Sequence, residues 1–103
     1  MKVEQFYNKN QFIIESENLI EFQSYKSLVA NINKKTGILT LGIDWDYSNT
    51  TMRHLYLFID DYKHYLKKDI CELFISFYRE KNKRKYMQNL IDNKKIKYDE
   101  NMK

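Results

Sequence analysis

The stretch from Thr40 to Thr51 most constrains the fold, because the hydrophobic pattern changes its period there. Before it, apolar residues form short β-branched and aromatic runs, which are typical of strands. After it, apolar and aromatic residues recur at the spacing of a helix, at Leu55, Tyr56, Phe58, Ile59 and Tyr62. Ser48 or Thr50 can cap the first turn of this helix. The sequence therefore predicts a change from sheet to helix, with a helix over about residues 49–64.

Two pairs of apolar runs precede this point. Phe12–Ile14 and Leu19–Phe22 are separated by a polar tetrad, which indicates a hairpin with a short loop. Leu28–Ile32 and Ile38–Leu41 flank a polar turn in which Gly37 can supply the positive φ angle that closes it. If neighbours pair, these runs form an antiparallel meander of three to four strands.

A second apolar stripe follows the first helix, at Ile70, Leu73, Phe74, Phe77 and Tyr78, and it resumes at Met87, Leu90 and Ile91. One long helix and two helices that meet near Asn82 both fit this pattern. After residue 94 the chain is polar and lacks periodicity, which predicts a frayed tail over residues 95–103. We therefore expect one α+β domain over residues 1–94, with the sheet in 1–47 and a helical half in 48–94.

The positive charge lies in the helical half. Residues 1–50 carry five Lys against six Asp or Glu, and residues 51–103 carry thirteen Lys or Arg against eight, which gives −1 and +5. Such an imbalance favours polyanions or acidic protein surfaces. The single cysteine, Cys71, cannot form an internal disulfide, and no apolar run approaches the ~20 residues of a membrane helix. These features predict a cytoplasmic protein without a membrane partner.

A run of cations is the strongest surface signal in the sequence. Our candidate binding residues are Arg79, Lys81, Lys83, Arg84, Lys85 and Tyr86, with Lys94 and Lys95 further along. Lys and Arg beside tyrosine can contact phosphates and stack on unpaired bases, or can face an acidic groove of a protein. A plain solvated helix face fits the same pattern.

Acidic residues flank the change of period. Asp44 and Asp46, with Asp60 and Asp61, resemble paired carboxylates or a divalent-cation site, but their spacing matches no calcium loop. We predict instead that Asp44 and Asp46 favour the helix N-terminus, and that Trp45 between them anchors the core.

Other residue types that can carry chemistry are scattered. His54 and His64 have neither a metalloprotease motif nor a cysteine at metal-ligand spacing, so we place them at the surface or its boundary. Cys71 lies on the apolar face of its helix and is interpreted as a small buried hydrophobe. We therefore expect no enzymatic activity, no metal and no cofactor.

Four segments together resemble a known group of proteins: Phe6–Ile14, Phe22–Ala30, Thr40–Gly42 and Asp44–Thr51. They are similar to small uncharacterised proteins encoded by phages and prophages of low-GC Gram-positive bacteria. The likeness covers roughly residues 6–62 and brings no enzymatic motif. Small phage proteins of this kind include inhibitors of host immunity, anti-CRISPR proteins among them.

The resemblance implies a protein of the infected or lysogenic host cytoplasm that binds a host protein or ribonucleoprotein complex. A CRISPR nuclease that it blocks stoichiometrically is the expected target. The alternative is a nucleic-acid-binding accessory protein that uses the basic C-terminal helices on phosphate. The net positive charge argues against an inhibitor that mimics duplex DNA, because such a protein needs an acidic surface.

Overall fold

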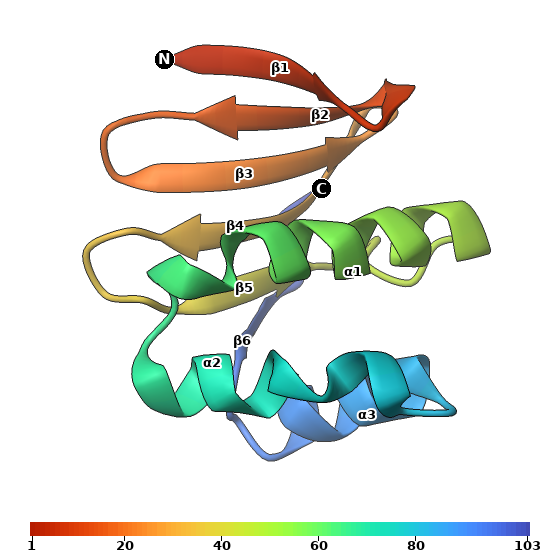
Figure 1. The fold of residues 1–103 in the computed structure, drawn as a ribbon. Coiled ribbons are helices and arrows are strands. Elements are labelled where there is room, and N and C mark those ends of the chain that lie inside the picture. The colour runs from red at the N-terminus through yellow and green to blue at the C-terminus, as the bar shows by residue number, and fades with distance from the viewer.

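A six-stranded sheet and three α-helices make up the computed structural model, which describes residues 1–103 (Figure 1). The strands lie in chain order across the sheet: β1 (Lys2–Phe6), β2 (Asn8–Glu15), β3 (Leu19–Ser24), β4 (Ser27–Asn33), β5 (Leu39–Gly42) and β6 (Lys97–Asp99). The first five pair antiparallel, and β6 pairs parallel to β5. The predicted α+β class is confirmed, but the sheet has more strands than the predicted three to four.

Both predicted hairpins are present. In the first, Ile13 pairs with Phe22, and both side chains are buried on the face that meets the helices. In the second, Gly37 has a φ angle of 71°, as its turn requires. A Cβ atom there would also lie 2.6 Å from the backbone nitrogen of Lys67, so the glycine lets the turn approach the helical half. Lys67 N–H donates to the Gly37 carbonyl at 3.0 Å, which ties the two halves together.

The first helix, α1 (Asn49–Tyr62), begins and ends close to the predicted positions. The Ser48 hydroxyl accepts from the N–H of Thr51 at 3.1 Å, so the predicted Ser48 cap is confirmed. A short 3₁₀ helix, η1 (Lys63–Tyr65), continues its last turn.

The second apolar stripe divides between two α-helices. α2 (Lys68–Ile75) is followed by the 3₁₀ helix η2 (Phe77–Arg79), and α3 (Lys83–Asp92) begins after a break. The Asn82 side chain accepts from the N–H of Lys85 at 3.0 Å and caps α3. Of the two arrangements that the sequence allowed, the structure has two helices that meet near Asn82.

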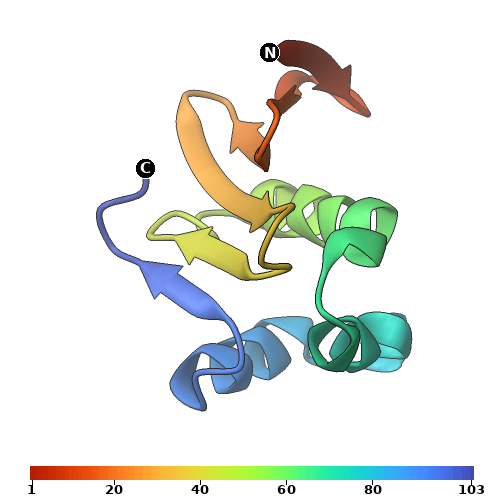
Figure 2. The ribbon, with the colours of Figure 1, turned by 90° about the vertical axis from the view of Figure 1, so that its left-hand side faces the viewer.

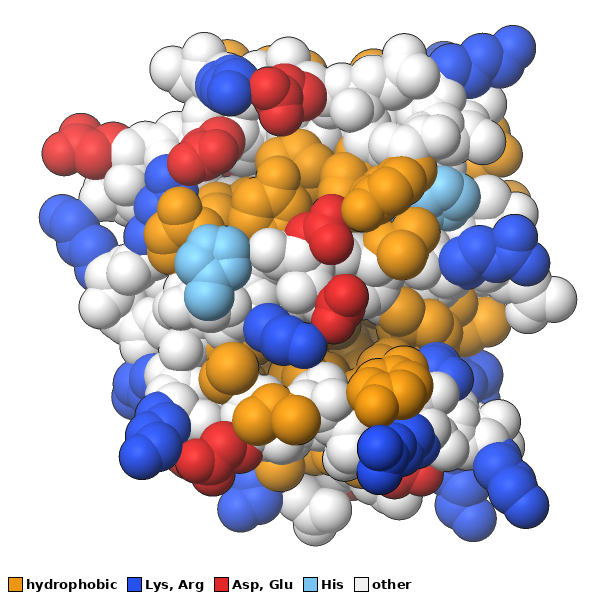
Figure 3. Space-filling view, viewed as in Figure 1, with side chains coloured by type: hydrophobic (Ala, Val, Ile, Leu, Met, Phe, Trp, Pro, Cys, Tyr) orange, Lys and Arg blue, Asp and Glu red, His pale blue; other side chains and the backbone are white.

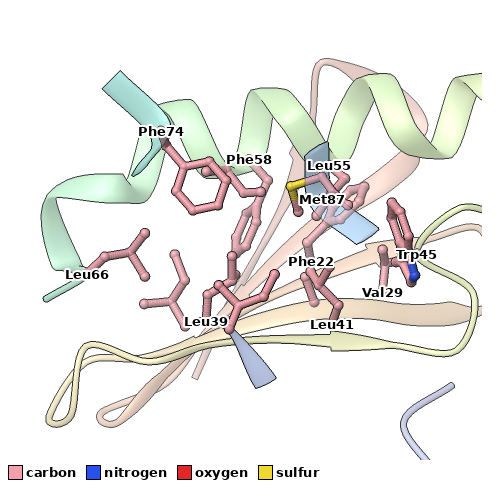
Figure 4. Packing of buried hydrophobic residues seen from close by; sticks show 14 of the residues in the cluster. Phe22, Val29, Leu39, Leu41, Trp45, Leu55, Phe58, Leu66, Phe74 and Met87 are labelled. Atoms are coloured by element: carbon pink, nitrogen blue, oxygen red, sulfur yellow. The ribbon is translucent and has the colours of Figure 1, made fainter. Parts of the chain in front are cut away.

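The core lies between the sheet and the helices (Figure 4). α1 runs along the middle strands and covers them, while α2 and α3 lie toward the β6 edge (Figures 1 and 2). Phe58 of α1 stacks on Phe22 of β3, with ring centroids 5.7 Å apart. Trp45 is 3% exposed and packs near Val29 and Leu41 (Figure 4), which confirms it as a core residue.

The expectation of a frayed tail over residues 95–103 is corrected by the structure. Lys97–Asp99 form β6, and Ile96 and Met102 on either side of it are buried. The Met102 carbonyl accepts from the N–H of Ile43 at 3.1 Å, and it approaches Gly42 so closely that a Cβ there would lie 2.5 Å away. Only two residues of this segment are buried, so its sequence is mostly polar and shows no periodicity although the segment completes the sheet.

We predict that Trp45→Ala lowers the free energy of unfolding by about 3–5 kcal/mol, because it leaves a cavity between the sheet and the helices. Urea denaturation measures the change. Tyr47→Ala is the matched control, since Tyr47 is 76% exposed two residues away. Equal stability of the Trp45 and Tyr47 variants would show that the indole is not a core anchor.

We also predict that Met102→Ala lowers the free energy of unfolding by about 2 kcal/mol, because a buried methionine is truncated. The exposed neighbour Lys103 supplies the control Lys103→Ala, which should leave stability within about 0.5 kcal/mol of the parent. A frayed tail would give two indistinguishable denaturation curves.

Candidate functional site: a basic surface on the third helix

The predicted cation run lies on η2, the turn after it and the first turn of α3. We call Arg79, Lys81, Lys83, Arg84 and Lys85 the basic surface. Lys83, Arg84 and Lys85 occupy the first turn of α3, which holds no acidic residue. The helix dipole makes this end of a helix electropositive, so cations there are each unfavourable by about 0.3–1 kcal/mol. These three charges therefore oppose the helix, whereas the Asn82 cap supports it.

Two of these cations are held by other groups of the chain. The Arg84 guanidinium contacts a carboxylate oxygen of Asp46, with Nη2 at 2.7 Å and Nε at 3.1 Å. Lys83 Nζ donates to the carbonyl oxygens of Tyr78 and Glu80, both at 3.1 Å. The fold therefore fixes the positions of both groups.

The other three cations of the surface are exposed and have no acidic partner within the chain: Arg79, Lys81 and Lys85. The Arg79 guanidinium lies 5.5 Å from the ring centre of Tyr78, which is 67% exposed. Figure 3 shows Lys and Arg side chains spread over the lower part of this face, where α2 and α3 lie. The surface therefore offers free cations and one exposed aromatic ring.

The structure separates the remaining predicted residues from this surface. Tyr86 is half-buried, its hydroxyl donates to the Leu73 carbonyl at 2.6 Å, and its ring packs against Phe77. Lys94 and Lys95 lie beyond the last turn of α3, at the opposite end of this helix from Lys85. Cations near the C-terminus of a helix interact favourably with its dipole. The contacts of Tyr86 join α3 to α2 and η2.

α1 adds to the site a residue that lies outside the predicted cation run. A hollow of about 420 Å³ separates α1 from the start of α3, and its lining includes Arg53 and Tyr56 from α1 and Lys81 to Arg84 from the other side. Arg53 is exposed and makes no ion pair. Nothing local in the sequence links it to residues nearly thirty positions away.

The four acidic residues that the sequence offered as a possible carboxylate or cation site, Asp44, Asp46, Asp60 and Asp61, are dispersed. Asp46 binds Arg84, whereas Asp60 binds Lys63 at 2.9 Å and Asp61 accepts from the Tyr7 hydroxyl at 2.8 Å. Asp44 lines a separate hollow of about 900 Å³ between the β3–β4 turn and the start of α1. No three His, Cys, Asp or Glu side chains lie close enough together to hold a metal ion.

The histidines and the cysteine lie apart from the basic surface. His54 is buried, with its Nδ1 atom 2.8 Å from the Thr50 carbonyl, so its expected place at the surface or boundary is wrong. The helix buries it because position 54 shares a face with the buried residues Thr51 and Phe58, three positions before it and four after it. His64 is exposed against Tyr65, and Cys71 is half-buried at the edge of the core.

These features define an α+β domain with a basic surface where its second and third helices meet. Residues 1–76 match the Family of unknown function (DUF8033), and the chain therefore belongs to this family. The match covers β1 to β5, α1 and α2, and the basic surface lies beyond it. Neither the curated proteins nor the solved structures gave a match to this chain. None of the helices has both the length and the apolar composition that a membrane crossing requires.

Tyr56, beside the basic surface, has a strongly shifted pKa. Burial raises the pKa of its hydroxyl from 10.0 to about 12; Arg84 opposes the shift and Asp46 reinforces it. The folded state therefore keeps this proton at pH values where the unfolded chain releases it. This contribution to stability is complete below pH 10 and is lost as the pH rises toward 12.

We predict that the free energy of unfolding falls between pH 10 and about 12 and that Tyr56→Phe reduces this fall. Urea denaturation of both proteins at neutral and alkaline pH measures it. Tyr47→Phe, which removes an exposed hydroxyl, is the control. If the parent and Tyr56→Phe lose the same stability on alkalinisation, Tyr56 does not contribute.

Proposed function

We propose that this protein is a non-enzymatic inhibitor that binds a host defence effector, such as a CRISPR nuclease, in a stoichiometric complex through its basic surface. One observation carries the proposal: the first turn of α3 presents Lys83, Arg84 and Lys85 against the helix dipole. The fold compensates Arg84 through Asp46 and Lys83 through two carbonyl oxygens, but Lys85 has no side-chain partner within the chain. Residues that break a local stability rule in this way are characteristic of functional sites. An anionic partner supplies the missing compensation.

The charges repel one another as well as the dipole. Lys81 and Lys85 flank the anchored pair Lys83 and Arg84, and only Arg84 has an acidic partner within the chain. Their repulsion in water is modest but persists at physiological ionic strength, where the Debye length is about 8 Å. A surface with complementary negative potential removes it and steers the encounter.

Two observations favour a protein over a nucleic acid as the partner. Tyr86, which the sequence offered as a stacking ring, packs its ring against Phe77 and donates its hydroxyl to the Leu73 carbonyl. Tyr78 is therefore the one exposed ring beside the basic surface. Binding to single strands relies on several stacking rings along a groove. The resemblance to small phage-encoded proteins further supports a defence effector as the target. Nucleic-acid binding through phosphate contacts is the second candidate function.

The test compares two triple variants that remove the same charge. The first variant, Arg79→Gln, Lys81→Gln and Lys85→Gln, alters only exposed cations of the basic surface. The second, Lys9→Gln, Lys26→Gln and Lys35→Gln, alters exposed lysines of β2 and of the turns on either side of β4. We predict that the first variant weakens partner binding about tenfold or more at low salt and flattens its salt dependence. The second should bind like the parent. The free energy of unfolding of each variant should differ from that of the parent by at most about 0.5 kcal/mol per substitution.

The partner is first isolated from host lysate with the intact protein, and its activity is then titrated. Inhibition should be complete only at molar ratios near one or above. Complete inhibition at a few per cent of the effector concentration would mean turnover and would contradict the proposal. Gel shifts on random-sequence DNA and RNA test the second candidate: nucleic-acid binding that the first triple variant loses, without a protein partner, would replace the inhibitor proposal.

A further inference from the structure

An apolar groove runs between α1 and the α2–η2 segment, beside the basic surface. Its volume is about 480 Å³, and most of its lining is hydrophobic: Tyr56, Leu57 and Ile59 from α1, with Phe74, Ile75, Phe77 and Tyr78 from the other side. Figure 3 shows hydrophobic side chains on both sides of a hollow between the two helices. The molecule thus leaves apolar surface open where two helices meet.

The groove has a fixed floor and an exposed rim. Phe77 is buried, and its ring packs edge-on against Tyr56 at 5.0 Å and Phe74 at 5.5 Å. Ile75 and Tyr78, by contrast, are 57% and 67% exposed. Exposed large hydrophobic residues beside a preformed hollow are a feature of protein-binding sites.

The rim carries a positive charge. Asp60 and Lys63 neutralise each other in an ion pair, which leaves Arg53 and Lys83 as the net charge around the groove. Arg53, Tyr56 and Lys83 also line the hollow that reaches Lys81 and Arg84. The groove and the basic surface are therefore continuous, apolar at the Ile75 end and cationic at the Lys81 end.

We propose that this groove docks a segment of a partner protein that carries an exposed apolar side chain next to acidic residues. The inference rests on the proposed function and names the chemistry of its partner. The acidic residues complement Arg53 and Lys81, while the apolar side chain covers Ile75. Nucleic acid fits less well, because bases stack on exposed ring faces. Phe74 and Phe77 are buried and Tyr56 is half-buried, so Tyr78 is the one exposed ring of the groove.

The experiment selects binders from a displayed library of random short peptides. The intact parent protein is the bait, and Ile75→Glu is the counter-selection bait. Ile75 is exposed, so the variant should fold, and its melting temperature checks this. Ile75→Ala takes its place if it does not fold. We expect the enriched peptides to combine an apolar residue with flanking Asp or Glu.

The affinities of an enriched peptide for single-residue variants then test the apolar end and the cationic end of the groove separately. Ile75→Glu should weaken binding by about tenfold or more, as for a central interface residue. Arg53→Gln should weaken binding and flatten its salt dependence. Ile43→Glu and Lys9→Gln are the matched controls, because Ile43 is 45% exposed, Lys9 is exposed, and both lie outside the groove. Both controls should bind like the parent.

Three results would overturn the inference: no enrichment over the counter-selection bait, enriched peptides without acidic residues, or affinities that Ile75→Glu leaves unchanged. The proposed function fails separately. If the triple variant of the basic surface loses the host partner while Ile75→Glu retains it, the inhibitor proposal stands and the groove inference falls. If groove-binding peptides emerge but the triple variant inhibits as well as the parent, the proposal falls and the inference stands.

Discussion

The packing of α1 on the middle strands determines where the rest of the helical half lies. Phe58 stacks on Phe22 at one point of this contact, and at another the Thr51 and Ser24 hydroxyl oxygens lie 3.3 Å apart in a buried pair. Because this face of α1 is fixed on the sheet, its opposite face presents Tyr56 to Phe77 of η2. The groove and the hollow beside the basic surface both arise from that second contact.

Much of the fold could be predicted from the period of the hydrophobic pattern. The two hairpins, the first helix with its Ser48 cap and the buried Trp45 all follow from local signals. β1 and β6 could not be predicted, because each exposes nearly every side chain and shows no alternation. β6 in particular exists through its pairing with β5, more than fifty residues earlier, and no local pattern reports such a partner.

The candidate site was predictable as a charged run but not as a surface. The sequence places Arg84 beside Lys83 and Lys85, yet only the fold brings Asp46 to Arg84 and assigns Tyr86 to a helix contact. Arg53 and the exposed Tyr78 belong to the site through tertiary packing. The family match ends at residue 76, so α1 and α2 belong to the part of the chain that defines the family, whereas the free cations follow it.

The parallel pairing of β5 with β6 has a mechanical consequence for the helices between them. Both ends of the segment from α1 to α3 are fixed in adjacent strands, and Met102 holds the end of the chain beside Gly42. Separation of α1 from α2 and α3 would strain these strand contacts. The backbone of this surface is therefore preorganised, and preorganisation lowers the entropic cost of association. The edge strand β6 thus stiffens the groove between the helices, although it takes no part in lining it.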